Sequence, residues 1–203
     1  NMKGAAAETN MPKLDWENVW KTTDGFPVFK NINLDGVKGE IWDGEVATGY
    51  AGGNGTETDP YIIETARQLA YLIKHDVIDA VGSTYGKYYK LAADIYLNNI
   101  QDADWRTNNP NGWYETASNQ RFGGNFNGDG YAIYGLYYNG KKYAGLFPYI
   151  EMYFNDVTIE NIVVSYAYLN TSADSIGTFA ATLFGGSGHE LAFKNCFVDD
   201  NVY

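Results

Sequence analysis

The stretch "GGNFNGDGYAIYGL" (123–136) most constrains what this chain can fold into. It sets glycines beside Asn and Asp, between short runs of aromatic and β-branched residues, and helices disfavour this composition. Gly128 and Gly130 can adopt positive φ at little steric cost, and Asn127 and Asp129 tolerate it better than most residues. The stretch therefore predicts a tight corner between short β-strands, where the chain returns along its own earlier path.

Three later segments share one design, in which an apolar residue precedes a small or polar corner and alternating apolar positions follow. They are "YAIYGLYYNG" (131–140), "VTIENIVVSYAY" (157–168) and "LAFKNCFVDDNV" (191–202). Aligning their corners at Gly135, Asn161 and Asn195 gives spacings of about 26 and 34 residues. The intervening "AGLFPY", which contains Gly145, and "IGTFAATLFG" also resemble each other. This order predicts the stacked coils of a parallel β-helix.

One amphipathic helix is predicted over residues 65–80, "TARQLAYLIKHDVIDA". Thr65 and Gln68 have the spacing of a capping box, in which each side chain bonds a backbone amide at the helix start. The apolar residues recur every three or four positions: Ala66, Leu69, Leu72, Ile73 and Val77. Asp76 is expected on the opposite face. The helix must therefore cover an apolar surface.

The chain before this helix predicts a smaller unit. Residues 2–30 indicate a short helix with Trp16 and Trp20 at helical spacing, then a turn and a brief strand. The glycine-rich stretch that begins at residue 49 marks a boundary. We therefore expect one segment over 1–49 and a second over 50–203.

Charge and hydropathy exclude some partners. The net charge is −11 and the pI is about 4.5, whereas nucleic acids and anionic membrane surfaces attract basic proteins. No apolar run approaches the roughly 20 residues that a membrane-spanning helix needs. We expect no nucleic-acid binding and no membrane insertion.

The sequence predicts no catalytic site and no metal site. Cys196 is the sole cysteine and the two histidines, His75 and His189, lie far apart. Aligning the three corners puts Glu160 opposite Lys194, and Asp199 and Asp200 opposite uncharged residues, so no column of carboxylates forms as acid–base chemistry on a glycoside would require. The segments "NGTETD" and "NIQDADW" gather oxygen atoms that calcium prefers, but their spacing does not match an EF-hand loop. We expect no cofactor, with calcium as the alternative.

Tyrosine is abundant, with 18 copies. Strand alternation predicts five of them on outer faces: Tyr88, Tyr137, Tyr138, Tyr166 and Tyr168. Outward rings on stacked coils could stack on sugars or cover a partner's apolar surface. The alternative is that these rings bridge neighbouring coils, because aromatic residues favour strands.

The segments "GGNGTETDPYIIETARQLAYLI", "GKYYKLAADIYL", "FGGNFNGDGYAIYGLYY" and "YAGLFPYI" resemble the entry module of the GLUG-repeat surface proteins of bacteria. That resemblance implies a glycine-rich lead, a capping helix and then a right-handed parallel β-helix. Pro148 and the pair Gly177-Thr178 depart from the family's "GLFG" and Gly-Leu patterns. The first thirty residues resemble the segment that closes such arrays.

The resemblance implies an exported, extracellular or cell-surface bacterial protein used for adhesion, display or assembly. In this chain a segment that resembles the end of an array precedes one that resembles its entry module, and two explanations account for this order. The chain is a piece of a larger tandem protein, or the tail of one subunit completes the unfinished coil of the next, which would build a filament. Expected partners are other copies, neighbouring repeats or glycans. A polysaccharide-binding or carbohydrate-active module, and a passive spacer, remain as alternatives.

Overall fold

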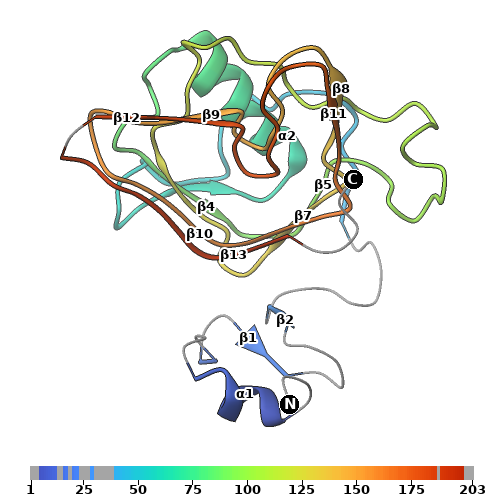
Figure 1. The fold of residues 1–203 in the computed structure, drawn as a ribbon, viewed down its shortest axis with the longest axis vertical. Coiled ribbons are helices and arrows are strands. Elements are labelled where there is room, and N and C mark those ends of the chain that lie inside the picture. The colour runs from blue at the N-terminus through green and yellow to red at the C-terminus, as the bar shows by residue number, and fades with distance from the viewer. Residues whose placement is uncertain are drawn as a thin grey trace.

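The computed structural model describes residues 5–12, 16–17, 20–22, 28–29, 39–186 and 188–198. These residues form a mainly β protein, a parallel β-solenoid of about three turns. The view in Figure 1 looks along the stack, so that strands of successive coils lie over one another. The prediction of a parallel β-helix is confirmed.

Each coil runs along several flat sides. The first side holds β3 (Tyr61–Ile63), β4 (Tyr88–Leu91), β6 (Asn125–Asn127), β10 (Val157–Ser165) and β13 (Leu191–Val198). Beyond a corner, the second side holds β5 (Ile95–Tyr96), β7 (Ala132–Tyr134) and the later halves of β10 and β13. The remaining sides hold β8 (Tyr137–Gly140) on β11 (Tyr168–Thr171), and β9 (Tyr149–Met152) on β12 (Thr182–Gly185). All of these pairings are parallel, so each coil lies in register on the one before it.

Inward side chains of successive coils stack into one core. On the first side, Tyr89, Phe126 and Ile159 lie in neighbouring register and are at most 1% exposed. Phe122 and Phe147 add a stacked ring pair with centroids 4.2 Å apart. Because each coil of a solenoid contacts only its neighbours, these columns and the parallel strand pairings together join one coil to the next.

The repeat alignment is correct at one corner and wrong at another. Asn161 and Asn195 lie opposite each other, and Glu160 lies opposite Lys194, as predicted. Gly135 does not align with them: it lies opposite Tyr166, and both residues have positive φ. The pairs Gly135-Leu136, Asn161-Ile162 and Asn195-Cys196 share one local pattern, a residue with positive φ followed by an apolar residue, although Gly135 lies at the second corner of its coil and the other two lie at the first. The sequence alignment therefore matched the second corner of one coil to the first corner of the next.

The corner in "GGNFNGDGYAIYGL" depends on positive φ and on a side-chain hydrogen bond. Asp129 and Gly130 have φ of 51° and 81°, as predicted. Asn127 does not have positive φ; its Oδ1 accepts a hydrogen bond from the Asp129 N–H over 2.7 Å. Gly128 does not have positive φ; a Cβ there would lie 2.4 Å from the carbonyl oxygen of Asn161. Glycine is required at 128 by the close approach of the next coil.

Close approach also explains Gly145. A Cβ at this position would lie 2.5 Å from the carbonyl oxygen of Gly177 in the following coil. Ala144 and Ile176 form a parallel bridge beside it. The predicted likeness of "AGLFPY" and "IGTFAATLFG" is therefore confirmed as two equivalent turns of successive coils.

The predicted helix over 65–80 covers one end of the stack. The helix α2 (Ala66–Tyr71) begins with the predicted capping box of Thr65 and Gln68, and continues as a π-helical segment over Leu72–Asp79. Its buried residues are Ala66, Leu69, Ala70, Leu72, Ile73 and Val77. Within the π-helical part these residues are spaced by four and five positions, which fits its wider turn.

Asp76 does not face solvent, contrary to the prediction. Its side chain is 13% exposed, and its Oδ2 accepts hydrogen bonds from the hydroxyls of Tyr50 and Tyr89, the latter over 3.2 Å. Burial and the neighbouring Asp76 carboxylate raise the pKa of Tyr89. The carboxylate thus ties the capping helix both to the glycine-rich lead and to β4.

The N-terminal segment contains α1 (Ala6–Asn10) and the antiparallel pair β1 (Trp20–Lys21) and β2 (Val28–Phe29). The helix ends before Pro12, since the residue preceding a proline disfavours helical geometry. Trp16 lies in a turn and Trp20 in a strand, so the expected helical spacing of the two tryptophans is wrong. The brief strand predicted near residue 28 is confirmed.

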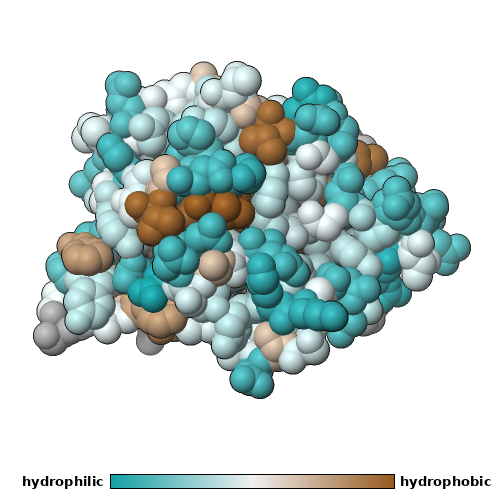
Figure 2. All heavy atoms as spheres, turned by 90° about the horizontal axis from the view of Figure 1, so that it is seen from above, coloured by the Kyte–Doolittle hydropathy of each residue, from teal (hydrophilic) through white to brown (hydrophobic). Residues whose placement is uncertain are grey.

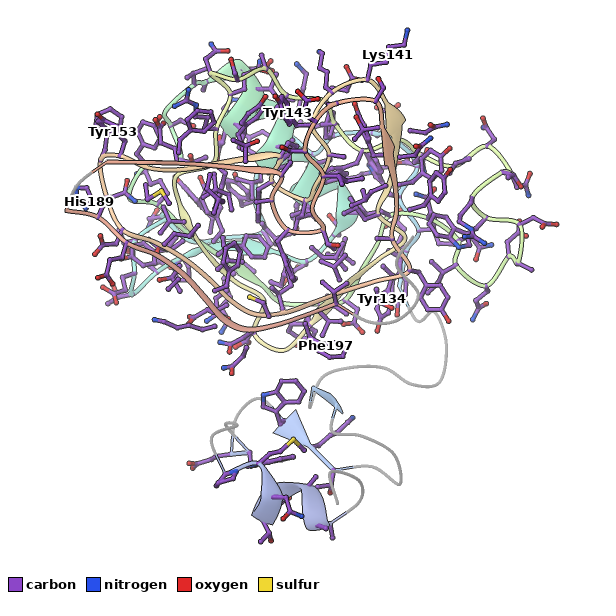
Figure 3. The ribbon with its side chains drawn as sticks, viewed as in Figure 1. Tyr134, Lys141, Tyr143, Tyr153, His189 and Phe197 are labelled. Carbon is purple, nitrogen blue, oxygen red and sulfur yellow. The ribbon has the colours of Figure 1, made fainter. Side chains whose placement is uncertain are left out.

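This segment contacts the solenoid through Trp20. The ring is 8% exposed and packs in a small outer cluster with Tyr96, Ala132, Tyr134 and Val163. Figure 3 shows Tyr134 and Phe197 on the side of the solenoid that faces the segment. Ile41 bridges to Tyr96 and Trp42 joins the main core, so these two residues of 1–49 lie with the solenoid.

Candidate functional site

The two ends of the stack differ. The first coil is covered by α2 and its π-helical continuation, whereas β11, β12 and β13 each pair along one edge with the preceding coil and with no other described strand. Their other edges carry backbone donors and acceptors that can pair with a further strand. We call the apolar face of this last coil the open end; its residues are Ile176, Leu183, Leu191, Phe193 and Cys196.

The exposure of the open end is clear from a comparison with the coil beneath it. Phe193 is 43% exposed, while Ile159, its neighbour in the preceding coil, is 0% exposed. Leu183 is 50% exposed, while its neighbour Ile150 is 0% exposed. The inward apolar rows thus continue into the last coil, and no described residue covers them there. Figure 2 shows another face, where hydrophobic side chains form only small separate patches among hydrophilic ones.

An asparagine ladder reaches the open end along one corner. The side-chain amide of Asn161 donates to Oδ1 of Asn127 over 3.2 Å, and that of Asn195 donates to Oδ1 of Asn161 over 2.9 Å. Asn170 and Asn139 form a similar bond of 2.9 Å on another side. In each pair the asparagine amide of the later coil donates a hydrogen bond to the asparagine Oδ1 of the earlier coil. Oδ1 of Asn195 therefore lies where an asparagine amide of a further coil would donate.

Cys196 belongs to the same surface. Its Sγ donates to the carbonyl oxygen of Ile159 over 3.2 Å, and burial raises the pKa of the thiol to about 11. A thiol with so high a pKa is mostly protonated near neutral pH and is a poor nucleophile. Its surroundings agree with the prediction of a small apolar residue of the coil interior.

The five predicted tyrosines do not form one ladder. Tyr137 and Tyr168 stack with ring centroids 5.3 Å apart on the outer side of β8 and β11. Tyr88 lies on the first side, and Tyr166 packs at a corner beside the outer cluster of Trp20. Tyr138 is 4% exposed and its hydroxyl donates to Glu115. The prediction that Tyr138 faces outward is wrong, since its ring packs in the main core.

The strand register shows which charged residues of successive coils lie opposite one another, for the part of the chain that the structure describes. The outer row on the first side runs through Lys90, Asn127, Glu160 and Lys194, with one carboxylate among the four. Asp199 and Asp200 lie outside the described residues. The alignment of the repeats predicted the pair of Glu160 and Lys194, but not that Lys90 and Asn127 belong to the same row, because that depends on the register between earlier strands. The alternation in "KYYKL" was the available signal for Lys90, since it puts Tyr88 and Lys90 on one face.

The oxygen-rich segments use their side chains within their own loops. In "NIQDADW", hydrogen bonds from Asn108 and from the backbone amide of Asp104 lower the pKa of Asp102. In "NGTETD", the amide of Asn54 donates to Asp59 over 2.6 Å. No group of three or more His, Cys, Asp and Glu side chains that could hold a metal ion occurs among the described residues.

Fold and surface together define a β-solenoid module with one capped and one open end. Two curated proteins are similar in sequence. A "Putative Gly-rich membrane protein" of Evansella cellulosilytica is 38% identical over 104 residues, which is 50% of this chain and 11% of that protein. "Halomucin" of Haloquadratum walsbyi is 28% identical over 149 residues, which is 70% of this chain and 2% of that protein.

The chain therefore spans only a small part of both relatives. No family model and no solved structure matches it. The resemblance to GLUG-repeat proteins accordingly stays a prediction. Within the described part of the chain, no helix is long and apolar enough to cross a membrane. Fold and relatives are together compatible with a structural module of a surface protein.

Proposed function

We propose that this chain is a non-catalytic structural and adhesive module of an extracellular or cell-surface protein, and that it assembles with other copies through its open end. The observation that carries the proposal is the exposed apolar row of the last coil, in particular Leu183 and Phe193. At about 25 cal/mol per Å² of buried apolar surface, covering such a row is favourable. The names of the relatives support the location at the surface.

The capped end restricts how copies can join. Because α2 and the π-helical segment cover the first coil, a second solenoid cannot stack directly on that end. We infer that the N-terminal segment of a second copy covers the open end, because in this structure the segment lies against the outer side of the same last coil. In the present structure Trp20 already contacts Phe197 of the last coil, with ring centroids 6.5 Å apart. Exchange of this segment between copies would link them head to tail, and a repeated link of this kind builds a filament.

Light scattering on the purified chain over a range of concentrations tests this proposal. We expect the mass to rise with concentration in multiples of the monomer, with linear particles in negative-stain micrographs. The double variant Leu183→Asp and Phe193→Asp should remain monomeric, because association would bury two carboxylates without partners. The matched control is Val81→Asp: Val81 is 52% exposed and follows the capping helix, so this variant should associate as the unmodified chain does.

Two results would refute the proposal. One is a monomeric mass for the unmodified chain at every concentration. The other is association of the double aspartate variant to the same extent as the control. Far-UV circular dichroism of each variant verifies that the coils remain folded.

A further inference from the structure

A groove of about 530 Å³ crosses the outer face of the first side of the solenoid. It runs over β4, β6, β10 and β13, four of the five strands of that side. Among the side chains that line it are Tyr88, Lys90, Asn127, Thr158, Glu160 and Lys194. The groove is separate from the open end and from the outer cluster around Trp20.

The strand register arranges polar groups along the groove in two parallel rows. One row holds Lys90, Asn127, Glu160 and Lys194. The other holds Tyr88, Asn125 and Thr158, where the backbone amide of Thr158 donates to Oδ1 of Asn125 over 2.9 Å. Successive members are one inter-strand step apart, about 4.8 Å. Such a surface offers the same kind of contact at each step, which suits an extended polymer lying along the solenoid axis.

The chemistry of the rows is mixed. Lys90 forms an ion pair with Asp129 over 3.0 Å, and the amide of Asn127 donates to Glu160 over 3.0 Å. Ammonium and amide groups donate hydrogen bonds, and carboxylates accept them. A ligand that carries both donors and acceptors at every unit can use both kinds, and the hydroxyl groups of a sugar have this property.

The negative charge of the chain and of the groove favours neutral over acidic polysaccharides. The chain carries a net charge of −11, and the groove has three carboxylates, from Glu57, Asp156 and Glu160, against two lysines. A polyanion such as a polyuronate would be repelled by this balance. Tyr88, the partly buried first member of the second row, offers a ring face on which a sugar ring can stack.

We propose that the groove binds a neutral oligosaccharide chain along the solenoid axis, with one sugar ring on Tyr88 and further hydroxyls bonded to Glu160 and Lys194. This gives the module a ligand site beyond assembly. It also places glycan contact on the first side rather than on the stacked pair of Tyr137 and Tyr168.

The test uses the whole chain and defined sugars. Cellohexaose, laminarihexaose and mannohexaose are titrated by isothermal calorimetry, with hexagalacturonate as the acidic comparison. We expect at least one neutral hexasaccharide to bind, and hexagalacturonate to bind more weakly. Tyr88→Ala and Lys194→Ala should each weaken the neutral ligand about tenfold, a change of about 1.4 kcal/mol.

Tyr137→Ala is the matched control, since it also removes a partly exposed strand tyrosine but lies outside the groove. It should leave the affinity unchanged. The proposal is overturned if no neutral hexasaccharide binds, if hexagalacturonate binds more tightly, or if Tyr137→Ala abolishes binding while Tyr88→Ala does not. Lys194 lies on the exposed last strand, so Lys194→Ala tests the groove even if Tyr88→Ala unfolds the chain.

Discussion

Replacing Phe147 with alanine is expected to lower the free energy of unfolding by about 3–5 kcal/mol, the range for removing a fully buried phenylalanine ring. Phe147 is 1% exposed, stacks on Phe122 at 4.2 Å and meets Phe126 edge-on at 5.3 Å. The loss would be a large part of the 5–15 kcal/mol typical of whole domains. Urea unfolding followed by circular dichroism and by tryptophan fluorescence measures it.

Phe154 provides the matched control for Phe147. It is 64% exposed and contacts Tyr85 with ring centroids 5.1 Å apart. Its replacement by alanine should cost less than about 1 kcal/mol, because little surface becomes newly exposed. Equal losses for the two variants would show that Phe147 does not lie in the core.

The second large effect is expected for Gly128→Ala. The new Cβ would lie 2.4 Å from the carbonyl oxygen of Asn161 and 2.8 Å from Cα of Ile162. Both atoms belong to the backbone of the next coil, so the two coils must move apart. We expect a loss near the upper end of the roughly 1–3 kcal/mol seen for overpacked sites, measured by the same urea unfolding.

Gly112→Ala is the control for Gly128. A Cβ at Gly112 would have no neighbour within 4 Å, and this glycine does not have positive φ. The change should therefore alter the free energy of unfolding by no more than about 0.5 kcal/mol. If Gly128→Ala were equally harmless, the next coil could not lie against that corner.

The architecture was largely predictable because its signals are local. Corners need residues such as Gly130 and Asp129 that accept positive φ, and the capping box of Thr65 and Gln68 identifies its helix within four residues. What failed depends on neighbours distant in sequence. The chain does not reveal that Gly128 is constrained by the next coil, or that Asp76 is covered by Tyr50 and Tyr89.

The candidate sites were less predictable for the same reason. Alternation places Tyr88 and Lys90 on one face of a strand, and aligning the repeats places Glu160 opposite Lys194. Only the register shows that Lys90 and this pair belong to one row. Likewise, Phe193 reads as an ordinary inward residue of a strand. Its 43% exposure follows from its position in the last described coil, which no property of its own segment reveals.

The register of the coils can be tested most directly with engineered cysteine pairs, in a chain whose own thiol is removed by Cys196→Ala. Asn139 and Asn170 are exposed and lie opposite each other on β8 and β11, at the inter-strand distance of about 4.8 Å, which a disulfide can bridge. Tyr168 is two residues before Asn170 on the same strand, which puts its Cα about 8 Å from that of Asn139, too far for a disulfide.

Peptide mapping by mass spectrometry after mild oxidation reads out the crosslinks. Parallel stacking predicts that the pair Asn139→Cys and Asn170→Cys crosslinks within one chain in high yield, while Asn139→Cys and Tyr168→Cys does not. Absence of the first crosslink, or equal yields for both pairs, would contradict the stacked parallel coils on which the open end and the groove depend.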